Sequence, residues 1–112
     1  MKTLAFDVYG TLINPLGIAE ALQECIGGDA PAFAAAWRAK QLEYLFRRGL
    51  GRKYQPFSVC TRQALDFTCL STGHDIPAVS RDALMARYLE LPAFEEAAAA
   101  LQSLNALGWR CF

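Results

Sequence analysis

Three residues near the start of the chain, Asp7, Gly10 and Thr11, have the types and spacing of a nucleophile site. They follow an apolar run, residues 4–6, that has the character of a buried strand. An ionised carboxylate at the end of a buried strand is costly unless hydrogen bonds or a cation offset its desolvation. Gly10 allows a sharp turn, and Thr11 places a hydroxyl within reach of Asp7. The alternative is that Asp7 only caps the turn; its neighbours favour a nucleophile.

A second candidate, Arg38, lies in the segment 37–44, which reads WRAKQLEY. On a helix, Arg38, Gln41, Leu42 and Leu45 share one face, so a guanidinium would lie beside apolar side chains. A planar group that is always charged suits both a carboxylate and a free anion. Spacing alone favours a solvated surface arginine, and the anion-binding interpretation stays open beside it.

Other polar residues are predicted to have structural roles. His74 stands beside Asp75 in a segment that reads as a loop, so we expect a solvated side chain without chemistry. The cysteines show no Cys-x-x-Cys spacing and are predicted to be buried free thiols that fill the core. They are Cys25, Cys60, Cys69 and Cys111.

The segment 4–12, LAFDVYGTL, resembles the first motif of the haloacid dehalogenase superfamily. Asp7, Gly10, Thr11 and Leu12 fall on that motif without a gap. Phosphatases of the superfamily carry a second Asp as general acid where this chain has Tyr9, and in this respect the chain resembles the type II (S)-2-haloacid dehalogenases. An alkoxide leaving a phosphate ester needs a proton, whereas a halide leaves as the anion of a strong acid. Tyr9 therefore argues against phosphoryl transfer.

The resemblance implies hydrolysis of a small (S)-2-haloalkanoic acid to the 2-hydroxy acid, with no metal and no cofactor. Asp7 would attack the carbon that bears the halogen and form an ester, which water would then hydrolyse. Thr11 would orient Asp7, and Arg38 would bind the substrate and the departing halide. The residues implied to form the apolar substrate pocket are Tyr9, Leu42 and Phe57. The alternatives are a phosphatase of the same superfamily and a catalytically inactive fragment.

Helical periodicity and capping residues predict the elements that must position these side chains. After a first strand at residues 4–7, the predicted helices are residues 15–26, 29–48, 58–72, 80–91 and 94–107, with Asn14, Asp29, Ser58 and Ser80 as N-caps and Gly27, Gly49, Gly73 and Gly108 as stops. Residues 109–112 then read as a second short strand.

This order predicts an α/β fold class, with a Rossmann-like core interrupted by an inserted α-helical cap. Residues 1–13 and 92–112 would form the partial core, and residues 14–91 the cap domain. The resemblance covers nearly the whole chain, but the later Ser/Thr-Asn, Lys and acidic motifs of the family are absent from it. We therefore expect the chain to be truncated, an N-terminal part that begins the second core strand and stops.

The composition narrows the class of partner. The chain of 112 residues is 54% apolar and 20% charged with a formal net charge of zero, so it has no electrostatic bias toward nucleic acid or an anionic membrane. No apolar stretch approaches the roughly 20 residues of a membrane span, and no signal-peptide pattern is present. The expectation is a cytoplasmic protein whose partner is a small 2-haloacid, with a homodimer as an option for the full-length family.

Overall fold

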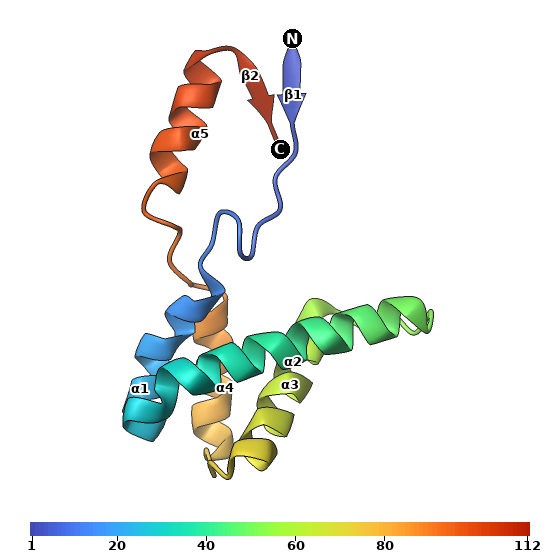
Figure 1. Cartoon of the computed structure of the whole chain (residues 1–112), viewed down its shortest axis with the longest axis vertical. Coiled ribbons are helices and arrows are strands. Elements are labelled where there is room, and N and C mark those ends of the chain that lie inside the picture. The colour runs from blue at the N-terminus through green and yellow to red at the C-terminus, as the bar shows by residue number, and fades with distance from the viewer. The chain divides into compact units, whose positions relative to one another are not determined.

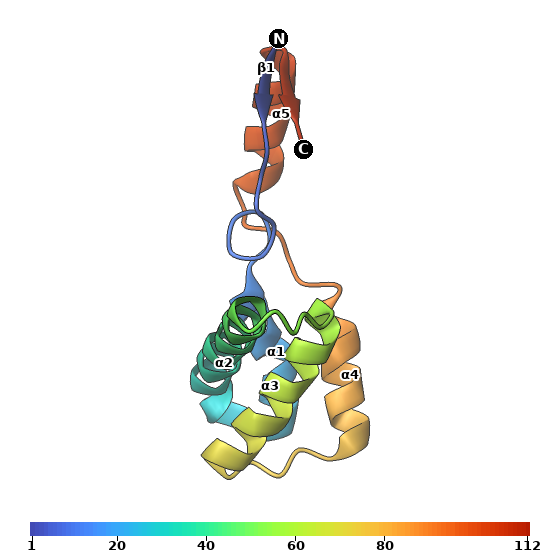
Figure 2. The same cartoon turned by 90° about the vertical axis from the view of Figure 1, so that its right-hand side faces the viewer.

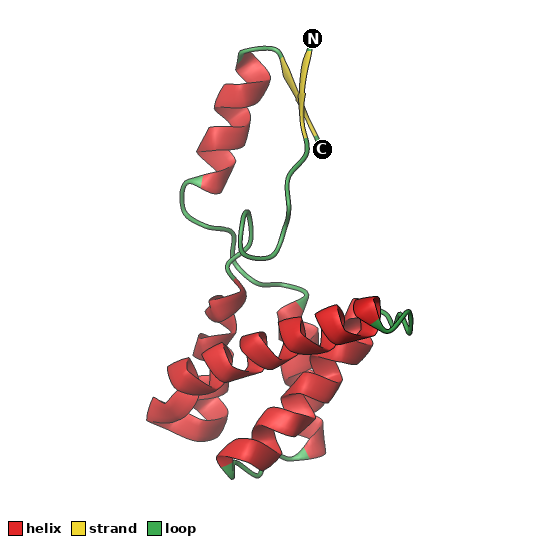
Figure 3. Cartoon of the chain, turned by 45° about the vertical axis from the view of Figure 1, so that its right-hand side comes forward, coloured by secondary structure: helices red, strands yellow, loops and turns green.

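The computed structural model describes all residues, 1–112, and divides the chain into two compact units. One, here called the sheet unit, consists of Met1–Gly17 and Leu91–Phe112; the other, the helical unit, is Ile18–Glu90. Figure 3 shows that all strand structure belongs to the sheet unit. The identification of these units as a core and a cap, with predicted boundaries near residues 14 and 91, stays a prediction.

The sheet unit holds strand β1 (Lys2–Leu4), strand β2 (Trp109–Cys111) and helix α5 (Ala97–Ala106). The strands pair in parallel, with Lys2 opposite Trp109 and Leu4 opposite Cys111 (Figure 1). Parallel neighbours need a crossover connection, and α5, which contacts β2, is the element that leads into the second strand. Gly108 allows the tight passage from α5 to β2 because its φ is +79°.

The helical unit is built from α1 (Ala19–Ile26), α2 (Ala30–Leu50), α3 (Phe57–Thr72) and α4 (Ala78–Tyr88). Two short 3₁₀ segments, Pro15–Ile18 and Gly27–Asp29, lie before α1 and α2. Figure 2 shows α1, α2, α3 and α4 gathered around a common centre. The largest apolar side chains at this centre, each at most 2% exposed, are Ile18, Leu22, Phe33, Trp37, Leu65, Ile76 and Leu84. The structure contains no helix that could span a membrane.

Several predicted helix ends are confirmed. The side-chain Oδ1 of Asn14 accepts a hydrogen bond from the backbone N–H of Leu16 at 3.1 Å, as expected of a residue that starts a helix. Gly27 follows α1 with a φ of +62°, and Gly73 follows α3 with a φ of +74°. Gly73 has the left-handed conformation that commonly ends a helix, whereas Gly27 has a positive φ outside that region; glycine adopts both at low steric cost.

Other predicted ends are wrong. Ser58 and Ser80 lie inside α3 and α4, which begin one residue after Pro56 and Pro77. A proline with φ near −60° and an extended ψ already directs the chain into the first helical turn, so no hydroxyl cap is needed. Gly49 also lies inside a helix, because α2 continues through Leu50.

His74 is not the solvated residue that the sequence predicts. Its Nε2 lies 3.3 Å from the Asp29 carboxylate, and its ring meets the ring of Phe33 edge-on at a centroid distance of 5.8 Å. Asp29 precedes α2 but makes no side-chain capping bond there. The contact instead joins the loop after α3 to the start of α2.

The cysteines divide by burial. Cys60 and Cys69 are buried free thiols, as predicted, and burial raises the pKa of the Cys69 thiol. Cys25 is exposed and Cys111 is half-buried, so the prediction of core filling is wrong for these two residues. A buried thiol with a raised pKa is a poor nucleophile.

Candidate active site

Asp7 lies in a tight turn that follows β1. The Thr11 hydroxyl donates a hydrogen bond to Asp7 Oδ2 at 3.0 Å. The backbone of the turn is closed by other groups: the Val8 carbonyl accepts the N–H of Thr11 at 3.2 Å, and Gly10 N–H donates to the Ile13 carbonyl at 2.8 Å. Gly10 has a φ of +95°, which a residue with a side chain rarely adopts. The backbone hydrogen bonds of the turn therefore do not involve the Asp7 carboxylate, which stays exposed.

The surroundings of Asp7 differ from the buried strand that the sequence predicts. Strand β1 ends at Leu4, and Asp7 itself is exposed. A parallel sheet buries its strands only when helices cover both faces and further strands lie alongside. The sheet here has only β1 and β2. The two strands of this sheet therefore leave Asp7 exposed.

Two segments of the sheet unit are joined close to this turn. The N–H of Asn14 donates to the Pro92 carbonyl, and the N–H of Phe94 donates to the Leu12 carbonyl, each at 2.9 Å. A Cβ added to Gly17 would lie only 2.8 Å from the Pro92 ring, so the contact requires a residue without a side chain. The segment that leaves the Asp7 turn is thereby fixed against the segment that leads to α5.

Arg38 lies on α2 and belongs to a hydrogen-bond network in the helical unit. One Nη of Arg38 donates to Gln41 Oε1 at 2.7 Å, and the Tyr88 hydroxyl donates to the same oxygen at 3.0 Å. Gln41 Nε2 donates to the Thr61 hydroxyl at 2.6 Å, and Thr61 donates to the Phe57 carbonyl at 2.7 Å. The network connects α2, α3 and α4 around one amide group.

Aromatic rings surround this network. The ring of Tyr88 lies 5.2 Å from the Trp37 ring and 6.3 Å from the Phe57 ring, measured between centroids. Trp37 Nε1 donates to the Thr61 carbonyl at 2.9 Å. Phe57, which begins α3, is thus held beside the same tyrosine that contacts Gln41. Aromatic pairs at these distances stabilise the packing around Gln41 beyond the effect of burial alone.

The candidate residues fall into two groups. Those in the sheet unit are Asp7, Tyr9 and Thr11; those in the helical unit are Arg38, Leu42 and Phe57. The structure joins Asp7 directly to Thr11, and it ties Arg38 and Phe57 to a shared network. Tyr9 and Leu42 are both half-buried. The catalytic and substrate-binding roles of all six residues stay predictions.

The sequence reasoning missed the roles of Gln41, Thr61 and Tyr88. One signal was available, because Gln41 follows Phe33 and Trp37 at intervals of four on the apolar face of α2. A polar side chain at such a position is buried and needs hydrogen-bond partners. Which residues of α3 and α4 supply them depends on helix packing.

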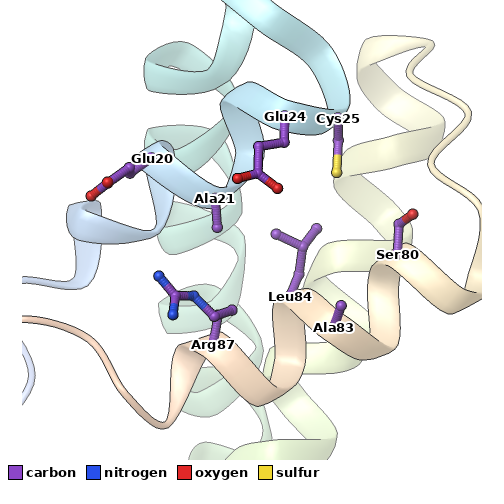
Figure 4. A pocket seen from close by; sticks show the side chains of 8 residues that line it. All are labelled: Glu20, Ala21, Glu24, Cys25, Ser80, Ala83, Leu84 and Arg87. Carbon is purple, nitrogen blue, oxygen red and sulfur yellow. The ribbon is translucent and has the colours of Figure 1, made fainter.

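A separate hollow in the helical unit, with a volume of about 470 Å³, does not fit an anionic substrate. Figure 4 shows Glu24 from α1 and Arg87 from α4 directed toward each other across it, with Glu20 at its edge. Two carboxylates outweigh a single guanidinium and repel an anion. The candidate functional residues therefore remain those of the Asp7 turn in the sheet unit and those of the Arg38 network in the helical unit.

Comparisons with known proteins extend these observations. The chain is 38% identical over 108 residues to (S)-2-haloacid dehalogenase from Pseudomonas sp. strain YL, covering 96% of this chain and 47% of that protein. It is 34% identical to haloacetate dehalogenase H-2 from Moraxella sp. strain B, covering 98% of this chain and 49% of the relative. The chain spans about half the length of the curated relatives it matches. No family model matches it.

The solved structures agree with the sequence relatives. L-2-haloacid dehalogenase from Xanthobacter autotrophicus with chloropropionic acid covalently bound superimposes with a TM-score of 0.84 at 30% identity, covering 94% of this chain and 43% of that one. These matches confirm the predicted resemblance to the haloacid dehalogenase superfamily. Within that superfamily, the chain is homologous to the (S)-2-haloacid dehalogenases over about half of their length.

Proposed function

We propose that this chain supplies the nucleophile and the anion-binding arginine of a hydrolase that converts small (S)-2-haloalkanoic acids into 2-hydroxy acids. The observation that carries the proposal is the turn in which Thr11 holds the Asp7 carboxylate, with Tyr9 where a phosphatase would have its acid. The homology to (S)-2-haloacid dehalogenases supports the same assignment.

In the proposed reaction, a carboxylate oxygen of Asp7 attacks the carbon that bears the halogen. The carbon–halogen bond breaks and the halide leaves with the bonding electron pair, which inverts the carbon and yields an ester. Water then adds to the Asp7 carbonyl carbon. The ester bond breaks, the 2-hydroxy acid leaves with the former Asp7 oxygen, and the carboxylate is restored with the release of a proton.

Two further groups complete the proposed site. Arg38 would bind the substrate carboxylate and stabilise the departing halide, because a guanidinium is a positively charged planar fork that suits both anions. Tyr9, Leu42 and Phe57 would form the apolar wall that excludes water from the nucleophile. The contact of Phe57 with Tyr88 supports its assignment to the same region as Arg38.

We also propose a domain organisation for the chain and a cellular compartment for the protein. The sheet unit would be part of a Rossmann-like core and the helical unit would be a cap domain. We place the protein in the cytoplasm, where unpaired cysteines such as Cys60 and Cys69 are common. Homodimerisation belongs to the proposal as well, with analytical ultracentrifugation as its direct test.

Isotope labelling in a single turnover tests the proposed reaction. The protein expressed from the complete gene would be mixed, in excess, with (S)-2-chloropropionate in water enriched in ¹⁸O. Because water attacks the enzyme's carbon, mass spectrometry should find the label in the peptide that contains Asp7, and the first 2-hydroxy acid should carry none. Label in that first product would mean direct attack by water, and no chloride release by the wild type would end the proposal. The matched control is Asp7→Asn, which should release no chloride.

A further inference from the structure

We propose that Gln41 is a positioning residue for Arg38, a role that rests on the proposed function of Arg38 as the anion-binding group. Gln41 would touch neither the substrate nor the reacting atoms. Its buried amide would fix the direction of the guanidinium without placing a negative charge beside it.

The hydrogen-bond donors around Gln41 fix the orientation of its amide. Arginine can only donate, so the Gln41 atom at 2.7 Å from Arg38 must be the carbonyl oxygen. The NH₂ group must then face Thr61, whose hydroxyl accepts a hydrogen bond from it at 2.6 Å and donates one to the Phe57 carbonyl at 2.7 Å. The Tyr88 hydroxyl lies 3.0 Å from the same carbonyl oxygen and donates to it. With this amide orientation, each of these four hydrogen bonds has one donor and one acceptor.

Burial makes this orientation rigid. Gln41 is 0% exposed and Thr61 is 1% exposed. If the amide turned over, its NH₂ group would face Arg38 and its oxygen would face Thr61, which would leave buried donors without acceptors. Water cannot compensate at fully buried atoms. The Arg38 guanidinium therefore donates to Gln41 Oε1, an oxygen that burial holds in one position.

The side chain that Arg38 contacts at position 41 is uncharged. A carboxylate at this position would pair with the guanidinium and compete with an anionic substrate, whereas an amide oxygen holds Arg38 without neutralising it. Glu43, the carboxylate that lies nearby on α2, is engaged by Lys40 at 2.6 Å and Arg47 at 2.7 Å. On α2, Arg38 thus contacts an uncharged side chain, whereas Glu43 pairs with cationic ones.

Nuclear magnetic resonance of the chain with ¹⁵N-labelled arginine tests the positioning directly. We expect the Arg38 side-chain N–H signals, identified by their loss in Arg38→Lys, to exchange with water roughly ten to one hundred times faster in Gln41→Met, as for a lost hydrogen bond to a charged group. Methionine keeps the length and the packing of the side chain but has no strong acceptor. Unchanged Arg38 exchange in a folded Gln41→Met would overturn the proposal.

The chain offers a matched pair of threonines as a control. Thr61 and Thr68 both lie on α3, are each 1% exposed, and each donate to the carbonyl four residues earlier at 2.7 Å. Only Thr61 also accepts from Gln41. Thr61→Val should therefore speed Arg38 exchange and Thr68→Val should not, although both remove a buried hydroxyl. An equal effect of the two variants would assign Gln41 a purely structural role, and this pair decides the matter even if Gln41→Met fails to fold.

Kinetics of the protein from the complete gene separate positioning from charge. Gln41→Met should lower kcat/KM for 2-chloropropionate by roughly tenfold or more, and Thr61→Val less. Gln41→Glu should keep Arg38 exchange slow yet raise KM, because the new carboxylate competes with the substrate; an unchanged KM would contradict the role of the neutral amide. If the wild type releases no chloride, the proposed function fails, whereas the exchange measurements still decide whether Gln41 positions Arg38.

Discussion

The Thr11 hydroxyl donates a hydrogen bond to the Asp7 carboxylate at 3.0 Å, across the turn that Gly10 closes. The bond occupies Oδ2 and leaves Oδ1 as the oxygen that Thr11 does not engage. A carboxylate with one oxygen held by a short local contact has fewer rotamers available in the turn. Preorganisation of this kind reduces the entropy that a nucleophile must lose before it reacts.

Loss of the Thr11 hydroxyl should lower turnover more than it lowers affinity. Thr11→Val keeps the shape of the side chain but removes the donor to Asp7, so we expect kcat to fall by roughly tenfold to hundredfold. Thr11→Ser keeps the donor and should retain most of the activity. Steady-state chloride release by the protein from the complete gene measures both. Equal losses in the two variants would show that the methyl group, and not the hydrogen bond, is what matters.

Replacement of Arg38 by lysine should reduce activity although it keeps the charge. Lysine is a point charge without the planar fork that can bind a carboxylate through two parallel bonds, so kcat/KM should fall by roughly tenfold or more. Arg48→Lys is the matched control, because Arg48 also lies on α2 and donates to a glutamine, Gln63, at 2.5 Å. A comparable fall in kcat/KM in both variants would contradict a specific role for Arg38 in anion binding.

Residues close together in the sequence could be predicted to form the site. Asp7, Gly10 and Thr11 belong to one turn, so their types and spacing already determine the hydrogen bond between the first and the last of them. The Gln41 network could not be read in the same way. Its members Thr61 and Tyr88 lie 20 and 47 residues away from Gln41, and only the packing of three helices brings them to the amide.

The helices were predicted well and their first residues less well. Apolar periodicity identified each of the four helices of the helical unit, because the buried face of a helix repeats every three to four residues. The starts of α3 and α4 were misplaced because a serine near a helix start resembles a cap, whereas Pro56 and Pro77 already provide the required backbone. The burial of β1 was overestimated because burial depends on neighbouring strands and helices, which an apolar run does not reveal by itself.

Removal of the Glu43 charge should matter only above the pH at which that carboxylate ionises. The hydrogen bond from Lys40, and then the nearby Arg47, hold the pKa of Glu43 below its ordinary value despite some desolvation. A depressed folded-state pKa adds stability above the unfolded-state value, and that stability is lost as the pH falls through the folded-state value. Glu43→Gln should therefore lower the melting temperature at neutral pH and leave it unchanged once the pH is low enough to protonate Glu43 in the folded protein, measured by circular dichroism. A difference that persists in acid would assign the effect to packing.

The two units should differ in stability when the 112-residue chain is studied by itself. In the sheet unit only Pro15 and Ala97 are buried, and Leu107 and Phe112 are 75% and 67% exposed. The helical unit has its own core, in which Trp37 is 1% exposed. Local opening is easiest where few apolar contacts are broken.

Hydrogen exchange followed by mass spectrometry should therefore find slow amides in α2 and α3 and fast amides in β1, β2 and α5. Leu65→Ala, at a fully buried position of α3, should cost about 2–5 kcal/mol and speed exchange throughout the helical unit. Leu104→Ala is the matched control in α5, where the side chain is only half-buried, and its effect should stay small and local. Uniform protection, with one sharp cooperative transition for the whole chain, would show that the sheet unit is as stable as the helical unit.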